Sequence, residues 1–346
     1  MTQALNLNDQ ETRKLRALYK ISGIEHRHTV LKDYAAEPGN YTFFPNSPHL
    51  KPFPTVGQRM ELYKQYALPL ATTAAQNCLQ QLAGFDVKTI THLISVSCTG
   101  MYAPGLDIEL IAALGLQPTT QRTCVNFMGC YAAFNGLKLA DAFVRANPEA
   151  KVLVVCTELC TLHFQARKEE DHLISNALFA DGAAAVLVQE EKTPGHNLSL
   201  ESFYCDLAPE GEQDMAWAIG DTGFEMTLSS YVPGLIQKGI GSLTQRLLQQ
   251  LKLELTDINF FAIHPGGTRI LKAIEEELGM SRDDNRFSYN VLRNYGNMSS
   301  VTVLFVLKEL LNTLQESDSG SNVLSFAFGP GLTLESMILK THYVQP

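Results

Sequence analysis

Short apolar runs alternate with longer amphipathic stretches along most of the 346-residue chain. In the first half, Thr91–Cys98, Lys151–Leu159 and Gly182–Gln189 are strand-like runs rich in apolar or β-branched residues, and Leu106–Gly115 has apolar positions at helical spacing. Strand-like and helix-like segments in alternation are typical of an α/β protein, in which helices pack against the faces of a sheet.

The second half repeats this order of segments. The repeated segments are Ile258–His264, Ile274–Met280, Val301–Asn312 and Val323–Gly329. Cys98 and Cys130 are 32 positions apart in the first half, and the matching His264 and Asn297 are 33 apart in the second. The sequence therefore predicts two duplicated α/β halves, residues 1–196 and 197–346, although any two α/β segments can show a chance likeness.

Composition and charge mainly exclude classes of protein and of binding partner. Hydrophobic residues make up 45% of the chain and charged residues 18%, which favours a folded protein over a disordered one. With 36 acidic against 27 basic residues the net charge is -9, so we expect no nucleic-acid partner. An anionic small molecule stays possible, because a local basic pocket or a helix N-terminus can bind phosphate on an acidic protein.

The targeting and redox signals indicate the cytoplasm. The first residues lack the apolar stretch of a secretory signal, and no later run has the length of a membrane span, so we expect no membrane partner. The seven cysteines are scattered along a long chain, unlike the dense framework of a small secreted domain. We expect reduced thiols, and their spacing does not predict a metal site.

Cys130 is the first candidate for chemistry. It follows a β-like run and a glycine, at the first residue of an amphipathic stretch, so we expect it to begin a helix. The positive end of a helix lowers the pKa of a thiol, to about 3.5–7.5 in reactive cases, which favours a nucleophilic role. The alternative is a small buried thiol in a packing site.

His264 and Asn297 occupy related places in the second half. His264 ends an apolar run and precedes Pro265 and two glycines, a turn that can expose an imidazole. Asn297 precedes a hydrophobic helix, where its alternative role is an N-cap. A cysteine, a histidine and an asparagine together can perform acyl transfer, because the imidazole keeps a thiolate available and both donors stabilise an oxyanion or enolate.

These residues lie in motifs that resemble one enzyme family. In chain order the motifs are CTGMYAPGLDIEL, the Cys130 segment, ALFADGAAAVLV, YVPGLI, HPGGTRIL, YGNMSS and FGPGLTLES. Together they resemble the thiolase-fold condensing enzymes, and within them the type III polyketide synthases of the chalcone and stilbene synthase type. The resemblance covers nearly the whole chain and implies a thiolase-like fold, two duplicated α/β halves in a layered αβαβα core.

The resemblance also implies a reaction. Cys130 would hold the starter acyl group delivered by an acyl-CoA, while His264 and Asn297 would bind malonyl-CoA and stabilise the enolate left by decarboxylation. Repeated condensation and cyclisation would give a resorcinol, phloroglucinol or pyrone product, with coenzyme A thioesters as substrates and no metal or redox cofactor. A single-round ketoacyl synthase or thiolase-like acyltransferase, and a non-catalytic partner of the same fold, are the alternatives.

The same comparison implies an acyl pocket. Phe179 matches the family's gatekeeper aromatic, and Met226 stands where many plant members have a second gatekeeper phenylalanine. The other pocket candidates are Cys98, Glu158, Cys160, His163, Ser299 and Trp217. Cys98, Cys160 and His163 replace threonines of plant members; the two cysteines make the wall less polar and favour an aliphatic starter, as in bacterial members that form alkylresorcinols or alkylpyrones. Neutral drift is the alternative.

The resemblance to the family is weaker at the residues expected to bind coenzyme A and at the expected subunit interface. Lys14, Arg27 and Gly266 are our candidates for coenzyme A binding, although the family's basic pattern is not reproduced, and the alternative for the two cations is a solvated helix face. The resemblance implies a homodimer, but Ala103 replaces a methionine that in plant members reaches into the partner's cavity. An acyl carrier protein is a further possible starter donor.

Overall fold

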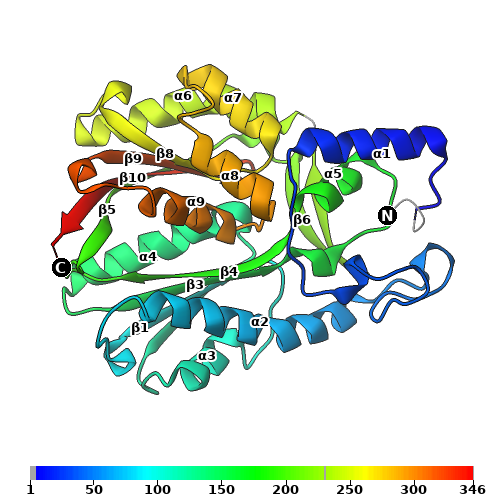
Figure 1. Ribbon diagram of the computed structural model, residues 1–346, viewed down its shortest axis with the longest axis horizontal. Coiled ribbons are helices and arrows are strands. Elements are labelled where there is room, and N and C mark those ends of the chain that lie inside the picture. Colours follow the sequence, from blue (N-terminus) through cyan, green and yellow to red (C-terminus); the bar gives the residue numbers. More distant parts are fainter. Residues whose placement is uncertain (1–4, 230, 346) are drawn as a thin grey trace.

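The fold has five layers, two sheets between three layers of helices (Figure 1). The computed structural model describes residues 5–229 and 231–345; the outer ends of the two predicted halves, residues 1–4 and 346, lie outside this part. The helices are α1 (Asp9–Ser22), α2 (Val56–Leu79), α3 (Leu106–Leu114), α4 (Ala132–Ala146), α5 (Glu170–Leu178), α6 (Val232–Leu251), α7 (Thr268–Leu278), α8 (Arg286–Tyr295) and α9 (Val301–Leu311). The strands are β1 (His92–Ser97), β2 (Gln121–Asn126), β3 (Val152–Leu159), β4 (Asp181–Val188), β5 (Gly195–Leu207), β6 (Met215–Gly220), β7 (Gly223–Leu228), β8 (Ile258–Ile263), β9 (Asn322–Gly329) and β10 (Thr333–Val344).

The first sheet has the strand order β2-β1-β3-β4. Strand β1 is parallel to both β2 and β3, whereas β4 runs antiparallel to β3. Every residue of β3 is buried, because helices cover the sheet on both faces. Helices α2 and α3 lie on its outer face.

The second sheet repeats this pattern, in the order β5-β10-β9-β8. Strand β8 is parallel to β9, and β10 is antiparallel to β9, as β1, β3 and β4 are in the first sheet. The predicted duplication is therefore confirmed. The halves differ in one element, because α8 follows α7 in the chain where β2 follows α3 in the first half. The boundary expected after residue 196 falls at the second residue of β5.

Helices α4 and α9 form the central layer between the two sheets (Figure 1). Helix α4 lies close to the first sheet because Gly136 has no side chain there: a Cβ atom at this position would be 3.0 Å from Val154 and 3.1 Å from Val96. Helix α9 is apolar on nearly all sides, as expected for a helix enclosed by two sheets. The first residues of both helices consequently lie deep in the molecule.

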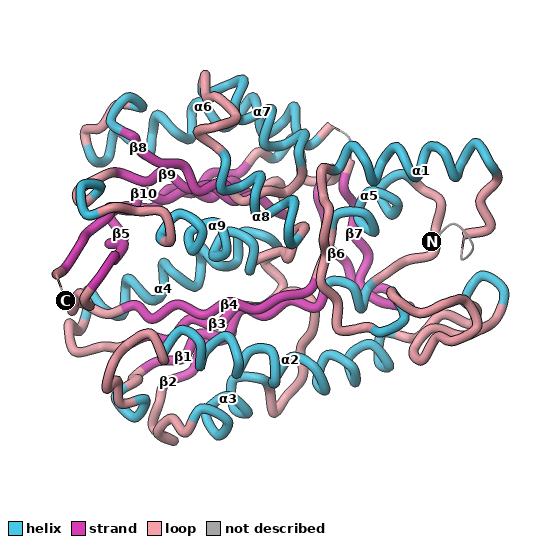
Figure 2. The backbone as a smooth tube through the Cα atoms, in the orientation of Figure 1, coloured by secondary structure: helices cyan, strands magenta, loops and turns pink. Residues whose placement is uncertain are grey.

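A smaller region adjoins one end of the layers. Figure 2 shows the antiparallel pair β6 and β7 apart from the two sheets and next to α5, with α1 beyond them. Within the described residues, no helix has the length and apolar character needed to cross a bilayer. All seven cysteines are free thiols. In the part of the chain that the structure describes, no group of three His, Cys, Asp or Glu side chains could hold a metal ion.

Candidate active site

A strained turn places Cys130 at the start of the central helix α4. Phe127, directly after β2, has a φ of 62°, and Gly129 has a φ of 81°. A Cβ atom on Gly129 would be 2.5 Å from Cδ of Pro330, so both the backbone conformation and the space favour glycine. Cys130 lies in the short 3-10 turn that leads into α4, as the sequence predicts.

The expectation of a low pKa for Cys130 is wrong in the absence of a bound ligand. Burial raises the pKa of the thiol to about 12, although hydrogen bonds with Ser299 and Asn297 act in the opposite direction. The largest cause is the loss of hydration, because the thiol lies where the central helices begin between the two sheets, and the buried Glu158 raises the pKa further. The thiol therefore needs a base to accept its proton.

His264 follows β8 and is 1% exposed. Its backbone N–H donates to the carbonyl of Phe326 at 2.8 Å. Both ring nitrogens are buried without a hydrogen-bond partner among the described residues, and burial lowers the pKa of the imidazole to about 3. The ring is therefore neutral, with one nitrogen able to accept a proton and the other able to donate a hydrogen bond.

Asn297 connects the Cys130 turn with the segment after His264. Its Oδ1 lies 4.0 Å from Sγ of Cys130, and its Nδ2 lies 3.5 Å from the carbonyl oxygen of Gly266. The backbone N–H of Ser299 donates to Oδ1 at 2.8 Å, which fixes the orientation of the amide because an N–H can only donate. Asn297 is not the N-cap of α9, which is Ser300, but its oxygen holds the turn before that helix through Ser299. The long Nδ2 contact leaves a donor for a substrate oxyanion.

Glu158 requires a correction, because it lies behind the cavity wall and does not line the cavity. The carboxylate is fully buried and accepts hydrogen bonds from the Cys98 N–H at 3.0 Å, the Thr99 hydroxyl at 2.8 Å and the Ser300 hydroxyl. Burial raises the pKa of Glu158, and these donors oppose the rise. Glu158 therefore fixes the segment of Cys98, whose Sγ is 3.1 Å from the Ser299 hydroxyl oxygen.

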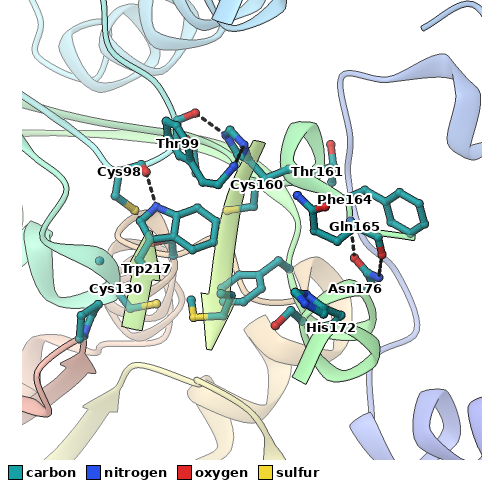
Figure 3. Close-up of a pocket in the computed structure, with 18 of the residues that line it drawn as sticks. Cys98, Thr99, Cys130, Cys160, Thr161, Phe164, Gln165, His172, Asn176 and Trp217 are labelled. Atoms are coloured by element: carbon teal, nitrogen blue, oxygen red, sulfur yellow. Dashed lines mark hydrogen bonds between the residues drawn. The ribbon is translucent and has the colours of Figure 1, made fainter. Parts of the chain in front are cut away.

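The other predicted pocket residues share one cavity with Cys130 (Figure 3). Those that line it are Cys98, Cys160, His163, Phe179, Trp217, Met226 and Ser299. The space left between the side chains is narrow, about 50 Å³. His264 and Asn297 are not among its lining residues, and Asn297 adjoins the cavity through its contact with Cys130.

An aromatic cluster forms one wall of this cavity. The ring of His163 stacks on Phe224, with centroids 4.2 Å apart, and Trp217 contacts both rings edge-on. Nδ1 of His163 accepts from the Phe224 N–H at 2.9 Å, so Nε2 carries the proton that is donated to the Thr99 carbonyl at 2.7 Å. Both nitrogens are thus occupied, and burial lowers the pKa of His163 to about 3, which makes this residue a neutral structural element.

The opposite end of the cavity is polar. Figure 3 shows Gln165, Asn176 and His172 across from Cys130 and Trp217. The Asn176 side chain donates to the Gln165 carbonyl at 2.8 Å and so fixes the two segments together. Sequence reasoning missed these residues and Phe224, because their polar or aromatic character carries no signal until the chain brings three distant segments together.

The gatekeeper candidate Phe179 is linked directly to Asn297. The Ala180 N–H donates to the Asn297 carbonyl and the Asn297 N–H donates to the Leu178 carbonyl, both at 2.9 Å. Arg27 donates from Nη1 to the carbonyls of Asn176 and Phe179, at 2.7 and 2.9 Å. Its guanidinium therefore stabilises the end of α5 and is not turned outward as a phosphate ligand would be.

The two remaining coenzyme A candidates lie apart from each other. Lys14 is an exposed residue of α1. Gly266 is half-buried in the loop after His264, where its carbonyl faces the Asn297 amide. Of the two, only Gly266 contacts candidate catalytic residues: its N–H donates to the His264 carbonyl at 3.0 Å, and its carbonyl faces the Asn297 amide.

Comparison with known proteins agrees with this geometry. The family model for the N-terminal domain of chalcone and stilbene synthases matches residues 3–192, and the model for the C-terminal domain matches residues 199–342. The chain belongs to the chalcone and stilbene synthase family. The type III polyketide synthase resemblance and the thiolase-like fold are thus confirmed, and the protein is a condensing enzyme that transfers acyl groups.

Individual relatives show the extent of the likeness. The chain is 35% identical over 289 residues to "Alpha-pyrone synthesis polyketide synthase-like Pks18" of Mycobacterium tuberculosis, covering 82% of this chain and 73% of that protein. The C-terminal type III polyketide synthase domain of Steely1 from Dictyostelium is 30% identical with a TM-score of 0.87, over 98% of this chain and 94% of that one. CsyB, solved in complex with CoA-SH, is 25% identical with a TM-score of 0.82, over 96% and 92%.

Proposed function

We propose that this type III polyketide synthase extends an acyl-CoA starter by repeated decarboxylative condensation with malonyl-CoA, and that Cys130, His264 and Asn297 perform the chemistry. The observation that carries the proposal is the position of Asn297 between the Cys130 thiol and the segment that follows His264. In this proposal the Cys130 thiol, the neutral imidazole of His264 and the Asn297 amide act together beside the cavity that Cys130 lines.

The first step is acyl transfer. The Cys130 thiol gives its proton to the neutral ring of His264, and the thiolate attacks the starter thioester. The carbon–sulfur bond to coenzyme A breaks, the coenzyme A thiolate takes up a proton, and the acyl group stays on Cys130. Burial opposes either charge alone, but thiolate and imidazolium form together and their attraction offsets part of that cost.

The second step is condensation. Malonyl-CoA loses carbon dioxide, and the electron pair of the broken carbon–carbon bond becomes an enolate whose oxygen accepts hydrogen bonds from His264 and from Nδ2 of Asn297. The enolate carbon attacks the acyl carbonyl on Cys130 and releases the thiolate. The resulting β-ketoacyl-CoA returns to Cys130 for another round or cyclises to a resorcinol, phloroglucinol or pyrone. This chemistry needs no metal or redox cofactor.

We infer an aliphatic starter from the wall next to Cys130. The side chains of Cys98 and Cys160 are less polar than threonines at these positions would be. Met226 is more flexible than a second aromatic ring would be. A thioether is flexible, so Met226 can move aside for an acyl chain in a cavity this narrow. The polar far end, at Gln165 and Asn176, suits the carbonyl oxygens of a lengthening ketide.

We also propose a cytoplasmic homodimer that takes its starter from coenzyme A, with an acyl carrier protein as a second possible donor. The support for a dimer is β2, which has a neighbouring strand on one side only within the described residues, together with two exposed apolar residues, Met101 at 40% and, on α3 against β2, Ile108 at 43%. The free thiols are consistent with a reducing compartment.

Intact-protein mass spectrometry tests the chemical assignment. Incubation with an acyl-CoA should add one acyl group, located on Cys130, and the adduct should be absent from Cys130→Ala while it persists in Cys205→Ala, which removes an exposed thiol. His264→Ala and Asn297→Ala should each reduce malonyl-CoA decarboxylation by about 10²-fold or more. An adduct that survives Cys130→Ala, or normal decarboxylation in both other variants, would remove these roles.

A further inference from the structure

Arg59, near the start of α2, is a completely buried cation. Burial lowers the pKa of its guanidinium to about 10, which leaves the group charged at neutral pH. Among the described residues no carboxylate forms an ion pair with it, and its Nη2 has no hydrogen-bond partner. A buried charge without an ion pair costs stability, and backbone carbonyls are the acceptors that offset part of this cost here.

The guanidinium holds the 3-10 turn that carries His163. Its Nη1 donates to the carbonyl of Leu162 and, at 3.2 Å, to that of Phe164. These two carbonyls flank His163, whose ring belongs to the aromatic cluster in the cavity wall. Its Nε donates to the Pro54 carbonyl at 3.3 Å, so the turn is connected to the segment that leads into α2.

The same side chain packs against the hairpin β6–β7. A Cβ atom on Gly223, the first residue of β7, would lie 2.9 Å from Nε of Arg59 and 3.0 Å from its Cδ. The next residue is Phe224, on which the His163 ring stacks. Arg59 therefore contacts both of the segments whose rings stack in the cavity wall.

The turn of this hairpin is held by two more hydrogen bonds. The N–H of Val56, the first residue of α2, donates to the Asp221 carbonyl at 2.9 Å. The Gln165 side chain donates to the Thr222 carbonyl at 3.2 Å. The start of α2 and the segment after His163 thus meet at one hairpin turn, with Arg59 between them.

We propose that Arg59 is a positioning residue that sets the width of the acyl cavity and thereby the range of acyl starters. This inference rests on the function proposed above. Arg59 does not line the cavity and acts through the two segments that it holds. Trp217 and Met226 are paired across the hairpin and do line the cavity, so a hairpin that moves outward makes the cavity wider.

The starter preference tests the proposal. Arg59→Met keeps an apolar stem of similar length and removes the donors, so it releases the wall without leaving a large void. With malonyl-CoA as extender, we expect the ratio of kcat/KM for a long aliphatic acyl-CoA to that for a short one to rise about fivefold or more. Arg59→Lys keeps the charge and some donors and should restore part of the wild-type ratio. A merely destabilised variant lowers both values equally, because both reactions share one concentration of active enzyme.

Two other variants complete this test. Arg145→Met is the matched control, since Arg145 donates to the Leu200 carbonyl at 2.9 Å outside the cavity, and it should keep the wild-type ratio. If Arg59→Met does not fold, Val56→Pro replaces it, because proline suits the first position of a helix and removes only the N–H that holds the hairpin turn. Its ratio should rise about twofold. An unchanged ratio in Arg59→Met, or in Val56→Pro where that variant replaces it, overturns the proposal.

Trp217 is the only tryptophan and reports on the hairpin without any substrate. Its indole N–H donates to the Cys98 carbonyl at 2.7 Å (Figure 3). Acrylamide should quench its fluorescence more strongly in Arg59→Met, because a released hairpin admits the quencher, and equally in wild type and Arg145→Met. Unchanged quenching with an unchanged starter ratio overturns the proposal while the synthase function stands. Stronger quenching in a protein whose wild type forms no condensation product confirms the wall contact, and the synthase function fails together with the starter role.

Discussion

At the scale of single residues, the site combines groups that burial keeps neutral. The pKa of Cys130 is raised to about 12 and that of His264 is lowered to about 3, in each case because the charged form loses its hydration. The thiol and the imidazole can therefore act in acyl transfer only together, with the imidazole accepting the proton of the thiol. Cys130 can become a thiolate at neutral pH only if a neighbouring base takes its proton.

This dependence predicts the pH profile of Cys130 alkylation. In wild type His264 can take the proton as the thiol reacts, whereas in His264→Ala only the small thiolate fraction set by the raised pKa reacts, so alkylation by iodoacetamide at pH 7 should slow by about tenfold or more. The rate should then rise about tenfold with each pH unit through pH 9. His172→Ala, which removes another histidine of the cavity, is the control and should keep the wild-type profile. Identical profiles for wild type and His264→Ala would refute the pairing.

At the scale of elements, the hairpin β6–β7 sets the width of the cavity. Met226 on β7 is paired with Trp217 on β6, and both side chains line the space next to Cys130. Met226→Phe should shorten the longest accepted aliphatic starter, because a rigid ring replaces a flexible thioether. Ile219→Phe, at a 59% exposed position of the same hairpin, should leave the range unchanged, as measured by product mass spectra across a chain-length series. An unchanged range in Met226→Phe would remove this residue from the specificity argument.

The turn before α4 predicts a specific cost for Gly129→Ala. The φ of 81° is unfavourable for alanine, and its Cβ would overlap Pro330 at 2.5 Å, so the free energy of unfolding should fall by about 1–3 kcal/mol or more, and product formation should drop because Cys130 is displaced. Gly115→Ala, with a φ of 68° and nothing within 4 Å, measures the backbone cost alone. Equal losses of stability in urea denaturation for the two variants would contradict the packing part of this account.

At the scale of the whole molecule, the unpaired edge of the first sheet predicts self-association. Light scattering should give twice the 38.2 kDa chain mass. Ile108→Asp, on α3 close to the edge strand, should shift the protein toward monomer, because it places a charge in an apolar interface. Ile219→Asp is the matched change at another exposed apolar position and should remain dimeric. A wild-type mass of one chain would show that the edge strand is covered in some other way.

The sequence alone predicted the large features of the molecule better than its details. The duplicated halves and the turn at Cys130 are visible in the chain, because periodicity and glycine placement are local properties. The position of Glu158 behind the wall, the pKa of Cys130 and the occupied nitrogens of His163 depend on packing between segments more than 50 positions apart.

The central claim is iterative condensation at this site, and product analysis tests it most directly. The purified protein would be incubated with ¹³C-labelled malonyl-CoA and a panel of short, long and aromatic acyl-CoA starters, and the products identified by mass spectrometry. We predict products that contain two or more malonyl-derived units, most abundant with aliphatic starters and absent with Cys130→Ala. Products with a single malonyl-derived unit, or none from any coenzyme A starter, would contradict the account.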